Sequence, residues 1–361
     1  MRILVTAAGS PGFLTLFKSL SEYQENLEIF ICDSNSESFN LKLFKNSFQA
    51  HPADSSEYIS QILNFCNSNL IDVVIPSSDE EVRSLGRNIK KFKECGIKVL
   101  STSSNLESIF NKKLFFERVR DHFPEIVPDF IEVKNSKEFE EAYSLLSKRN
   151  EKLCVKPAIA HGSRGFKVIQ NSSLNLEDFF SKKPNPHEIS YKELLSTLSQ
   201  KEEFPSLLLM EYMPGDEYSI DCLETSSGFL SVSRRRDTIK EGICSSGEAI
   251  KKEDLQKYSK LLYDLFQIEY NANFQFRYDK NGRPKIIELN PRFSGTMELC
   301  RGAGVDFAKL ALDKLLEKKC ESLPEIKWGT KMQRVWEEVF TYNGKTFVLE
   351  SVGSILERKN V

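Results

Sequence analysis

Three polar side chains alternate along one apolar segment in the last quarter of the chain. The segment "KIIELNPRFSG", residues 285–295, places Glu288, Asn290 and Arg292 two residues apart, directly after a pair of isoleucines. Side chains two apart in a strand point to the same face, so a carboxylate, an amide and a guanidinium would share one face. Such a set could bind a metal ion together with an anion.

A turn before this segment predicts a third oxygen ligand. Asn281-Gly282 is a strong signal for a two-residue hairpin turn, and in that register Gln275 pairs with Glu288. Gln275, Glu288 and Asn290 would then converge on one patch of oxygen atoms, which suits Mg²⁺ bound together with phosphate oxygens and water. The alternative interpretation is a polar sheet edge that faces solvent.

A second segment has the residues of a phosphate site. In "CVKPAIAHGSRGFKVI", Lys156 closes an apolar strand, where it is held rigidly enough to place a positive charge on a phosphate. Gly162, Ser163 and Gly165 follow in a turn whose backbone N–H groups could approach the outer phosphates. The pattern also occurs in ordinary hairpins, and the sequence contains no Walker-type GxxxxGK[ST] motif.

A third segment could hold a nucleoside. In "LLLMEYMPGDEYSID", an apolar strand ends in Glu211, Tyr212 and Met213, and an acid followed by free backbone can bind an adenine edge. Glu217, a few residues later, could accept hydrogen bonds from ribose hydroxyls. The alternative is a strand capped by a polar turn.

Polar residues also follow an apolar run in the N-terminal region. In "IDVVIPSSDEEV", Ser77, Ser78 and Asp79 come at the C-terminal end of a predicted strand. In open α/β sheets this is the edge at which ligands lie.

The elements that would position these residues form a parallel α/β unit followed by mixed α+β regions. Residues 1–105 alternate short apolar runs with helical patterns, which predicts a parallel α/β domain. A single helix is predicted over 106–123, then strands and a long polar helical stretch to about residue 204. The sequence pattern after residue 204 favours an antiparallel sheet with helices packed on it. Residues 326–361 are predicted to form strands that pack on the core or on another subunit, so a homodimer is one option.

The composition excludes several classes of protein. The 361 residues contain 50 Lys plus Arg against 52 Asp plus Glu, so neither nucleic acid nor an anionic membrane is an expected partner. The eight Cys form no CxxC pair, which is typical of buried thiols in a reducing cytosol rather than of zinc ligands. The N-terminal apolar run is too short for a signal peptide or a membrane span. We therefore predict a cytoplasmic protein.

In their order and spacing, these segments resemble the ATP-grasp superfamily, in particular the synthetase domains of the carbamoyl-phosphate synthase large subunit and related small carboxylate–amine ligases. The likeness covers roughly residues 1–320. It implies a Rossmann-like pre-ATP-grasp domain at 1–105, a small lid subdomain with a linking helix at 106–206, and a large subdomain with the metal site at 207–325. It further implies ATP and Mg²⁺, with Mn²⁺ as a substitute.

The resemblance also implies a role for each candidate residue. The implied nucleotide-binding residues are Lys112, Lys156, Gly162, Ser163, Gly165, Glu211, Tyr212, Met213, Glu217 and Arg234. Implied metal ligands are Gln275, Glu288 and Asn290, and implied catalytic residues that contact phosphate or acyl phosphate are Lys156, Arg236 and Arg292. Ser294, Gly295 and Arg301 correspond to the carboxylate substrate site, with Arg301 forming a bidentate pair.

Three departures from the family pattern leave alternatives open. The first phosphate lysine usually follows an Asp, but "FNKKLFFERV" offers Lys112 or Lys113 after an Asn. Gln275 replaces a carboxylate, and its neutral oxygen should hold a metal ion less tightly. The run "SRRRD" could instead be a solvated charged stretch.

The implied function is an ATP- and Mg²⁺-dependent ligase. A carboxylate would attack the γ-phosphate to give an acyl phosphate, which an amine then captures. Positioning and charge neutralisation do most of the work in phosphoryl transfer, so no nucleophilic side chain is required. An ATP-binding regulatory or scaffold protein without turnover is one alternative.

A second alternative is an NAD(P)-binding oxidoreductase. The segment "TAAGSPG" approximates a dinucleotide fingerprint, with Ala7 in place of the first Gly, then Gly9 and Gly12. Asp33 follows about twenty residues later, where the fingerprint has its ribose acceptor. This interpretation accounts for nothing after residue 105.

Overall fold

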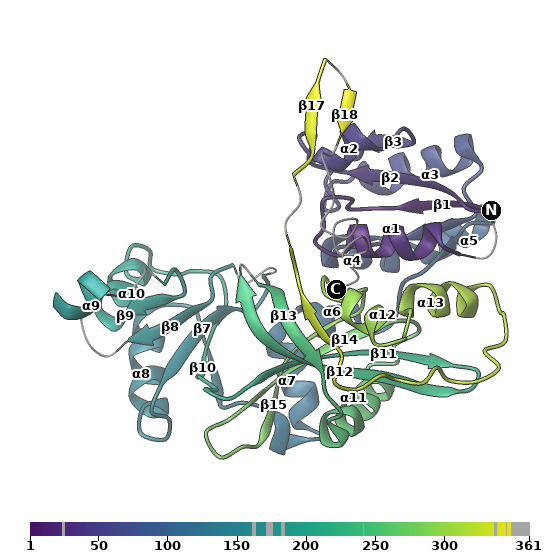
Figure 1. The fold of residues 1–361 in the computed structure, drawn as a ribbon. Coiled ribbons are helices and arrows are strands. Elements are labelled where there is room, and N and C mark those ends of the chain that lie inside the picture. Colours follow the sequence, from purple (N-terminus) through teal and green to yellow (C-terminus); the bar gives the residue numbers. More distant parts are fainter. Residues whose placement is uncertain are drawn as a thin grey trace.

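The chain folds into three sheets flanked by helices and one separate hairpin. The computed structural model describes residues 1–23, 26–160, 164–170, 176–181, 185–240, 242–335, 338–343 and 345–347. Figure 1 shows the N-terminal sheet at the upper right, a second sheet at the left and the largest sheet below and between them. Among these described residues, no helix is both long enough and apolar enough to cross a bilayer.

The N-terminal sheet is five-stranded and parallel throughout, as predicted, with the order β3-β2-β1-β4-β5. Its strands are β1 (Arg2–Val5), β2 (Glu28–Asp33), β3 (Ser47–Gln49), β4 (Val73–Ile75) and β5 (Lys98–Val99). Its helices are α1 (Phe13–Ser21), α2 (Phe39–Leu43), α3 (Tyr58–Asn69), α4 (Asp79–Arg87) and α5 (Ile89–Glu94).

Both faces of this sheet are buried, because alternate side chains of β1 contact different helices. Ile3 and Val5 pack with α1 and with α13 (Phe307–Leu315) from the far end of the chain. Leu4 packs on the other face with α3 and Phe92 of α5. The contact with α13 joins the N-terminal sheet to the C-terminal part of the chain.

Two short helices replace the single helix predicted over residues 106–123, so that prediction is wrong. Helix α6 (Leu106–Phe110) ends before Asn111, and α7 (Lys112–Arg120) begins after it. Asn111 has an extended backbone, and its side chain accepts hydrogen bonds from the N–H groups of Lys113 and Leu114. Asparagine is a good N-cap, so it ends one helix and starts the next.

The second sheet has the order β6-β10-β7-β8-β9 and is called the lid sheet below. Its strands are β6 (Phe130–Val133), β7 (Leu153–Pro157), β8 (Lys167–Gln170), β9 (Glu188–Ser190) and β10 (Leu207–Glu211). The associated helices are η1 (Pro124–Ile126, a 3-10 helix), α8 (Ser136–Leu146), α9 (Leu176–Ser181) and α10 (Tyr191–Leu198). The predicted long helical stretch is wrong, because β9 interrupts it and Ser190 then caps α10.

The largest sheet is antiparallel and six-stranded, with the order β15-β14-β11-β12-β13-β16. Its strands are β11 (Glu217–Thr225), β12 (Gly228–Lys240), β13 (Ile243–Ala249), β14 (Ala272–Tyr278), β15 (Pro284–Asn290) and β16 (Lys331–Gln333). Helices α11 (Glu253–Leu265) and α12 (Glu298–Gly302) accompany it, and β17 (Phe340–Tyr342) and β18 (Lys345–Phe347) form the separate hairpin.

The hairpin between β14 and β15 differs from the predicted two-residue turn. Tyr278 pairs with Pro284, and Asp279 N donates to Arg283 O, which leaves a three-residue loop whose last member, Gly282, has φ +72°. This loop is the common type that ends in a left-handed glycine. The register near the turn is therefore shifted by one residue from the prediction.

A β-bulge restores the predicted register at the candidate metal site. The pairing shifts between Phe276–Ile286 and Gln275–Glu288, so Ile287 is the extra residue on β15. Ile286 and Leu289 both lie in the hydrophobic core although they are three residues apart. A bulge changes which side chains face each side of a strand, and here it leaves Glu288 on the face opposite the core.

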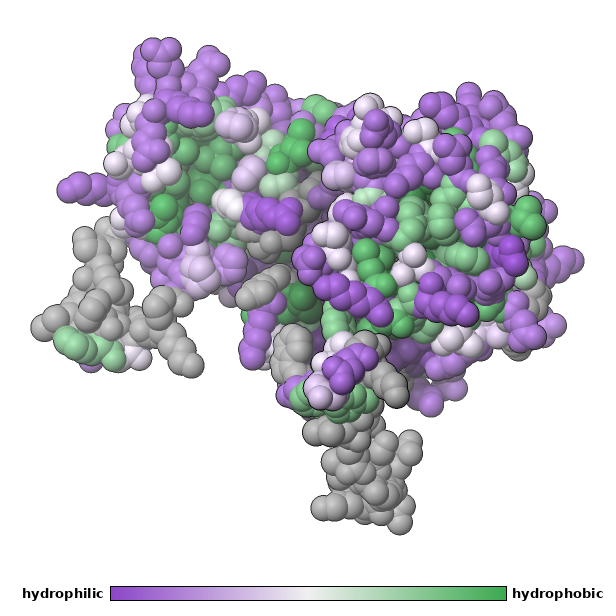
Figure 2. Space-filling view, turned by 90° about the horizontal axis from the view of Figure 1, so that it is seen from above, coloured by the Kyte–Doolittle hydropathy of each residue, from purple (hydrophilic) through white to green (hydrophobic). Residues whose placement is uncertain are grey.

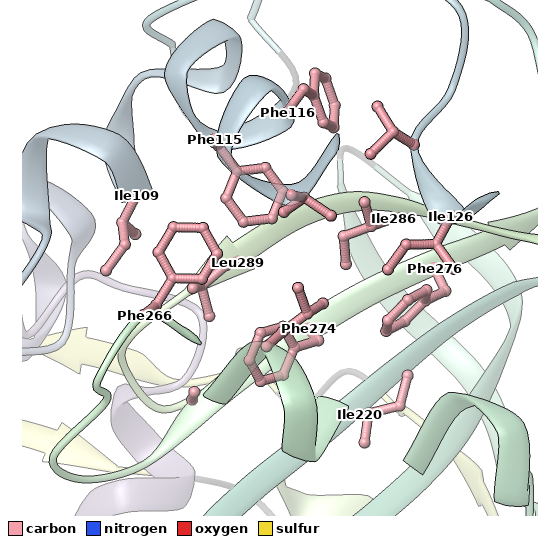
Figure 3. Packing of buried hydrophobic residues seen from close by; sticks show 14 of the residues in the cluster. Ile109, Phe115, Phe116, Ile126, Ile220, Phe266, Phe274, Phe276, Ile286 and Leu289 are labelled. Carbon is pink, nitrogen blue, oxygen red and sulfur yellow. The ribbon is translucent and has the colours of Figure 1, made fainter. Parts of the chain in front are cut away.

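That core lies between the large sheet and the helices that precede the lid. Figure 3 shows Phe115 of α7 and Phe266, which follows α11, close to Phe274 of β14 and Leu289 of β15. These side chains are nearly inaccessible to solvent. Burying such a face is strongly favourable, so the alternate residues of β14 and β15 are held rigidly on the other face.

Candidate active site

One cleft of about 860 Å³ collects residues from all three sheets. The carboxyl ends of β1, β2 and β4 line one side, and α7, the lid sheet and the large sheet line the rest. In Figure 2 a hollow separates the two upper lobes of the molecule. Twelve of the predicted site residues lie in this cleft: Lys112, Lys156, Tyr212, Met213, Glu217, Arg236, Gln275, Glu288, Asn290, Arg292, Ser294 and Gly295.

The three predicted metal ligands lie together on the cleft face of β14 and β15. Gln275 is directly opposite Glu288, and Asn290 Nδ2 donates to Glu288 Oε1 at 3.0 Å. Burial opposes ionisation of Glu288, but Lys112, Lys156 and the Asn290 hydrogen bond outweigh it, so the pKa of Glu288 is lowered. One carboxylate and two amide oxygens suit Mg²⁺ with phosphate oxygens completing the coordination. No set of three or more His, Cys, Asp or Glu in the described part of the chain forms another candidate metal site.

The two adjacent lysines at the start of α7 have different surroundings. Lys112 lies in the cleft, where its Nζ donates to Ala160 O at 2.7 Å. Burial lowers the pKa of Lys112, and Glu288 opposes this effect. Lys113 points away and forms an ion pair of 2.8 Å with Glu132. The geometry therefore favours Lys112 over Lys113 as the first phosphate lysine.

Lys156 lies on β7 opposite Leu208 of β10, at the lid side of the cleft. Its Nζ is 5.5 Å from the centre of the Phe166 ring, a cation–π contact that orients the side chain. Lys112 and Lys156 both lower the pKa of Glu288, so the two cations flank the candidate metal site from different elements. Gly162 and Ser163, the predicted phosphate-loop residues after Lys156, lie outside the described residues.

Gly165 lies two residues before β8 begins and does not line the cleft. It has φ +72°, and a Cβ there would be 2.6 Å from Pro157 Cγ. The glycine therefore lets the loop turn close to the strand that carries Lys156.

The predicted adenine residues separate into two groups. Tyr212 and Met213 line the cleft, and Arg277 Nη2 donates to Tyr212 Oη at 3.2 Å. Glu211 does not line it: its Oε1 accepts from Asp129 N at 3.1 Å. Burial raises the pKa of Glu211.

Arg236 reaches the cleft and already has several partners there. Its guanidinium is paired with Glu217 and donates to Gln275 Oε1 at 3.2 Å and to Gly242 O at 2.6 Å. The predicted ribose residue and a predicted metal ligand are thus connected by one arginine. Arg236 lies on β12, so its position is set by the large sheet.

The structure does not place Arg234 in the cleft, although it was predicted to face phosphate. Its side chain is 1% exposed and forms an ion pair with Asp221. It also donates to Ser294 Oγ at 3.0 Å and to Thr296 O at 3.0 Å. Arg234 therefore positions the loop at residues 294–296, which does line the cleft.

Arg301 is also outside the cleft, which corrects its predicted role as a carboxylate clamp. Its guanidinium contacts Glu22 at 2.8 Å, Asp306 at 3.1 Å and Glu298 at 3.3 Å. Three carboxylates leave no free face for a substrate carboxylate. Arg301 of α12 instead connects the end of α1, through Glu22, with the start of α13, through Asp306.

Arg292 links the metal site to the N-terminal sheet. Its guanidinium forms a two-point pair with Asp79, Nε to Oδ1 at 2.8 Å and Nη2 to Oδ2 at 3.1 Å. The same Nη2 is 3.3 Å from Asn290 Oδ1. Burial opposes the charge of Arg292, but Asp79 outweighs it and raises the pKa of Arg292. The Ser-Ser-Asp segment was the only sequence signal for this partner.

The dinucleotide interpretation finds no support at Asp33. The two oxygens of its carboxylate accept hydrogen bonds from the backbone N–H groups of Gly9 and Asn35. A Cβ at Gly9 would lie 2.9 Å from Asp33 Oδ2, so the loop after β1 closes tightly over this carboxylate. Asp33 thus stabilises the loop at positions where a ribose would have to bind.

Glu81 is a cleft residue that sequence reasoning missed. It is 6% exposed, and it accepts from Thr6 Oγ1 at 2.6 Å and from Tyr58 Oη at 3.2 Å. Burial, with a further contribution from Asp33, raises the pKa of Glu81 from 4.5 to about 7. Thr6, Asp33 and Tyr58 come from three segments distant in the sequence, so no local pattern could have indicated this environment.

The raised pKa of Glu81 predicts a specific pH dependence of stability. The folded protein holds this proton more tightly than the unfolded chain does, so stability falls as the pH rises from 4.5 to about 7. Glu81→Gln should remove this loss, which amounts to about 3 kcal/mol at neutral pH. The difference in unfolding temperature between the variant and the wild type should therefore grow between pH 5 and pH 8. A difference that is constant over this range would contradict the assignment.

Two family models match separate parts of the chain. Residues 203–338 match a family model described as ATP-grasp in the biosynthetic pathway with Ter operon, and residues 3–100 match the PylC-like N-terminal domain. No curated protein matches the chain significantly.

Several solved structures have a similar fold over most of this chain at low sequence identity. N5-carboxyaminoimidazole synthetase from Staphylococcus aureus, complexed with ADP, has a TM-score of 0.65 and 13% identity over 90% of this chain and 80% of that chain. An L-amino acid ligase from Bacillus licheniformis has a TM-score of 0.62 and 14% identity over 88% and 74%. The biotin carboxylase domain of 2-oxoglutarate carboxylase from Hydrogenobacter thermophilus, with MgADP and bicarbonate, has a TM-score of 0.63 and 14% identity over 91% and 73%.

Proposed function

We propose, from the premise that this chain is an ATP-grasp protein, that it is an ATP- and Mg²⁺-dependent ligase joining a carboxylate to an amine. One observation carries the proposal. Lys112 and Lys156 line the same cleft as the cluster of oxygen ligands, and both lower the pKa of Glu288. Two cations and a candidate metal site in one cleft match the charge of a nucleoside triphosphate.

Each part of the cleft would have a distinct task. Tyr212 and Met213, at the end of β10, would hold the adenine, and Glu217 would bind the ribose. Lys112 and Lys156 would hold the phosphates. Gln275, Glu288 and Asn290 would hold Mg²⁺, which neutralises charge on the transferred phosphoryl group. Structures of similar fold that are complexed with ADP or MgADP support this arrangement.

The reaction would proceed in two displacements. An oxygen of the substrate carboxylate attacks the γ-phosphorus of ATP, the bond from that phosphorus to the bridging oxygen breaks, and ADP leaves. The amine nitrogen then attacks the carbonyl carbon of the acyl phosphate and releases inorganic phosphate and a proton. Arg236 and Arg292, at the two ends of the metal cluster, would stabilise the charge on the moving phosphoryl group.

ADP release tests the proposed function directly. Purified protein with Mg-ATP should release ADP only when a suitable carboxylate and amine are both present, which a panel of amino acids and small carboxylates would reveal. Thermal shift with Mg-ADP and with NAD(P)H measures nucleotide binding separately, since a ligand stabilises the state that binds it. Stabilisation by NAD(P)H alone would refute the ligase proposal. Binding of Mg-ADP with no turnover for any pair would favour a nucleotide-binding protein without ligase activity.

The two neighbouring lysines provide a matched pair of variants. Lys112→Met should lower kcat/KM for ATP by about a hundredfold, the effect of losing one charged group at a transferred phosphate. Lys113→Met removes the same charge one residue away but should change kcat/KM less than about threefold, because Lys113 pairs with Glu132 outside the cleft. Steady-state kinetics with varied ATP would measure both. Equal effects of the two substitutions would contradict the assignment of Lys112.

A further inference from the structure

The charges of the cleft are divided between its two sides. All charged lining residues that come from residues 1–105 are acids: Asp33, Asp54, Asp79, Glu80 and Glu81. The described lining residues after residue 105 include two acids, Glu217 and Glu288, and six cations: Lys112, Lys156, Arg164, Arg236, Arg277 and Arg292. The phosphates of ATP would occupy the basic side. The acidic side would repel them, so it borders the space that remains for the other substrates.

Two of these acids, Asp33 and Glu81, have no ion-pair partner among the described residues. Asp79 is matched by Arg292, but neither Asp33 nor Glu81 forms an ion pair within the described chain. Their hydrogen-bond donors are neutral: backbone N–H groups for Asp33, and the hydroxyls of Thr6 and Tyr58 for Glu81. Both acids line the cleft. Glu81 accepts from Thr6, which follows β1, and Asp33 ends β2, which pairs with β1.

A buried hydroxyl beside this pair also has no partner. Ser77 is 8% exposed and lines the cleft, and its Oγ has no hydrogen-bond partner in the described structure. Its backbone N–H donates to Glu81, and its side chain lines the same cleft as Asp33 and Glu81. A buried polar group without a partner costs free energy, and a ligand that hydrogen-bonds to Ser77 would recover it.

We propose that Asp33, Glu81 and Ser77 form a subsite for a positively charged nitrogen, an ammonium or a guanidinium, on one of the two substrates. This nitrogen is separate from the group that reacts, and the inference rests on the proposed ligase function. The cation would supply the missing counter-charge to the two carboxylates and donate a hydrogen bond to the Ser77 hydroxyl. Charge-assisted hydrogen bonds of this kind are stronger than hydrogen bonds between neutral groups.

The subsite is connected to the phosphate end of the cleft. Glu81 and Asp79 both lie in the first turn of α4, and Asp79 pairs with Arg292, which contacts Asn290 of the metal cluster. A substrate could therefore have its reacting group near the phosphates and its cation at Glu81. The N-terminus of α4 would by itself favour an anion, but its first turn already contains three acids.

Two pairs of near-isosteric probes separate charge from shape. L-lysine and L-norleucine differ by the terminal ammonium, and L-arginine and L-citrulline differ by the guanidinium charge. Calorimetric titration of each probe into the full chain saturated with Mg-ADP should show at least about tenfold tighter binding of a cationic member than of its neutral partner, the ratio expected for one charge-assisted hydrogen bond. No preference for the cation in either pair overturns the inference.

Variants locate the effect at the subsite. Glu81→Gln keeps the size and the hydrogen-bonding atoms, and it should reduce the preference for the cation to near equality without changing the affinity for Mg-ADP. Ser77→Ala should weaken binding of the cation less, because it removes one neutral partner. Glu94→Gln makes the same charge change on the exposed end of α5 and serves as the control. A preference that survives Glu81→Gln would place the cation elsewhere and overturn the inference.

The same titrations separate the two proposals. If Mg-ADP does not bind to the wild type, the ligase proposal itself fails. If Mg-ADP binds but the cationic and neutral probes bind equally, only the subsite fails and the ligase proposal stands. Binding of the probes should also strengthen as the pH rises from 6 to 8, because Glu81 loses its proton in this range. Asp33, Tyr58, Thr6 and Ser77 surround Glu81, and the Tyr58 hydroxyl keeps its proton because burial raises its pKa.

Discussion

Replacing Glu288 by glutamine is expected to lower ADP release by at least about a thousandfold, equivalent to about 4 kcal/mol of transition-state stabilisation. Glu288 is the only carboxylate among the three predicted metal ligands, and the other two offer neutral amide oxygens. Without its charge, Mg²⁺ would be held by dipoles alone, and Lys112 and Lys156 would lose the anion between them. The variant should also need much higher Mg²⁺ concentrations, which a magnesium titration of the residual activity would measure.

A matched substitution on the same sheet distinguishes this effect from a loss of folding. Glu224 lies on β11 outside the cleft and pairs with Lys260 at 3.0 Å on the surface. Glu224→Gln removes the same charge and should leave the activity within about twofold, because exposed ion pairs contribute little. Glu288→Gln should retain the wild-type unfolding temperature within a few degrees. A Glu288→Gln protein that is folded and turns over at the wild-type rate would rule out the metal-site assignment.

Replacing Asp221 by alanine is expected to destabilise the protein by about 3–5 kcal/mol, because it leaves a buried guanidinium without its counter-charge. Asp221 pairs with Arg234, accepts from Asn273 Nδ2 at 3.0 Å and contacts Cys300 Sγ at 3.2 Å. Burial opposes the charge of Arg234, and Asp221 outweighs it, so the pKa of Arg234 is raised. Thermal unfolding followed by tryptophan fluorescence and by circular dichroism would measure the loss.

Two further variants test that the cause is the unpaired charge. Asp221→Leu combined with Arg234→Met removes both charges and should recover much of the lost stability, as replacing a buried ion pair by apolar groups commonly does. Asp264→Ala breaks an exposed pair with Lys260 on α11 and should cost less than about 1 kcal/mol. A double variant no more stable than Asp221→Ala would mean that packing around Asp221, rather than charge, is responsible. Activity of the double variant should still fall, since Arg234 positions residues 294–296.

Several features of the fold follow directly from local sequence pattern. The alternation of short apolar runs and helical periods over residues 1–105 predicted a parallel sheet, and all five strands are parallel. The two-residue repeat of side-chain direction in a strand predicted that Glu288 and Asn290 share a face. These inferences succeeded because hydrophobic periodicity records which side of an element is buried.

One local prediction failed where the hydrogen bonds of a single nearby side chain decide the backbone. The Asn281-Gly282 signal predicted a two-residue turn, whereas Asp279 accepts from the N–H groups of Asn281 and Arg283 and stabilises a longer loop. The bulge at Ile287 then brings Gln275 opposite Glu288 all the same. The predicted pairing is thus correct at the metal site and shifted by one residue near the turn.

By itself, the sequence determined which chemical groups this protein has and on which strands they lie: Lys156 on β7, and Glu288 and Asn290 on one face of β15. Only the tertiary structure decided which of two similar residues on the same strand reaches the cleft. Arg234 and Arg236 share a face of β12, yet Arg234 is covered by residues 294–296 and Arg236 is not. The environment of Glu81 likewise depends on side chains from β1, β2 and α3. Charge and burial depend on every group within a few ångströms, and those groups are brought together only by folding.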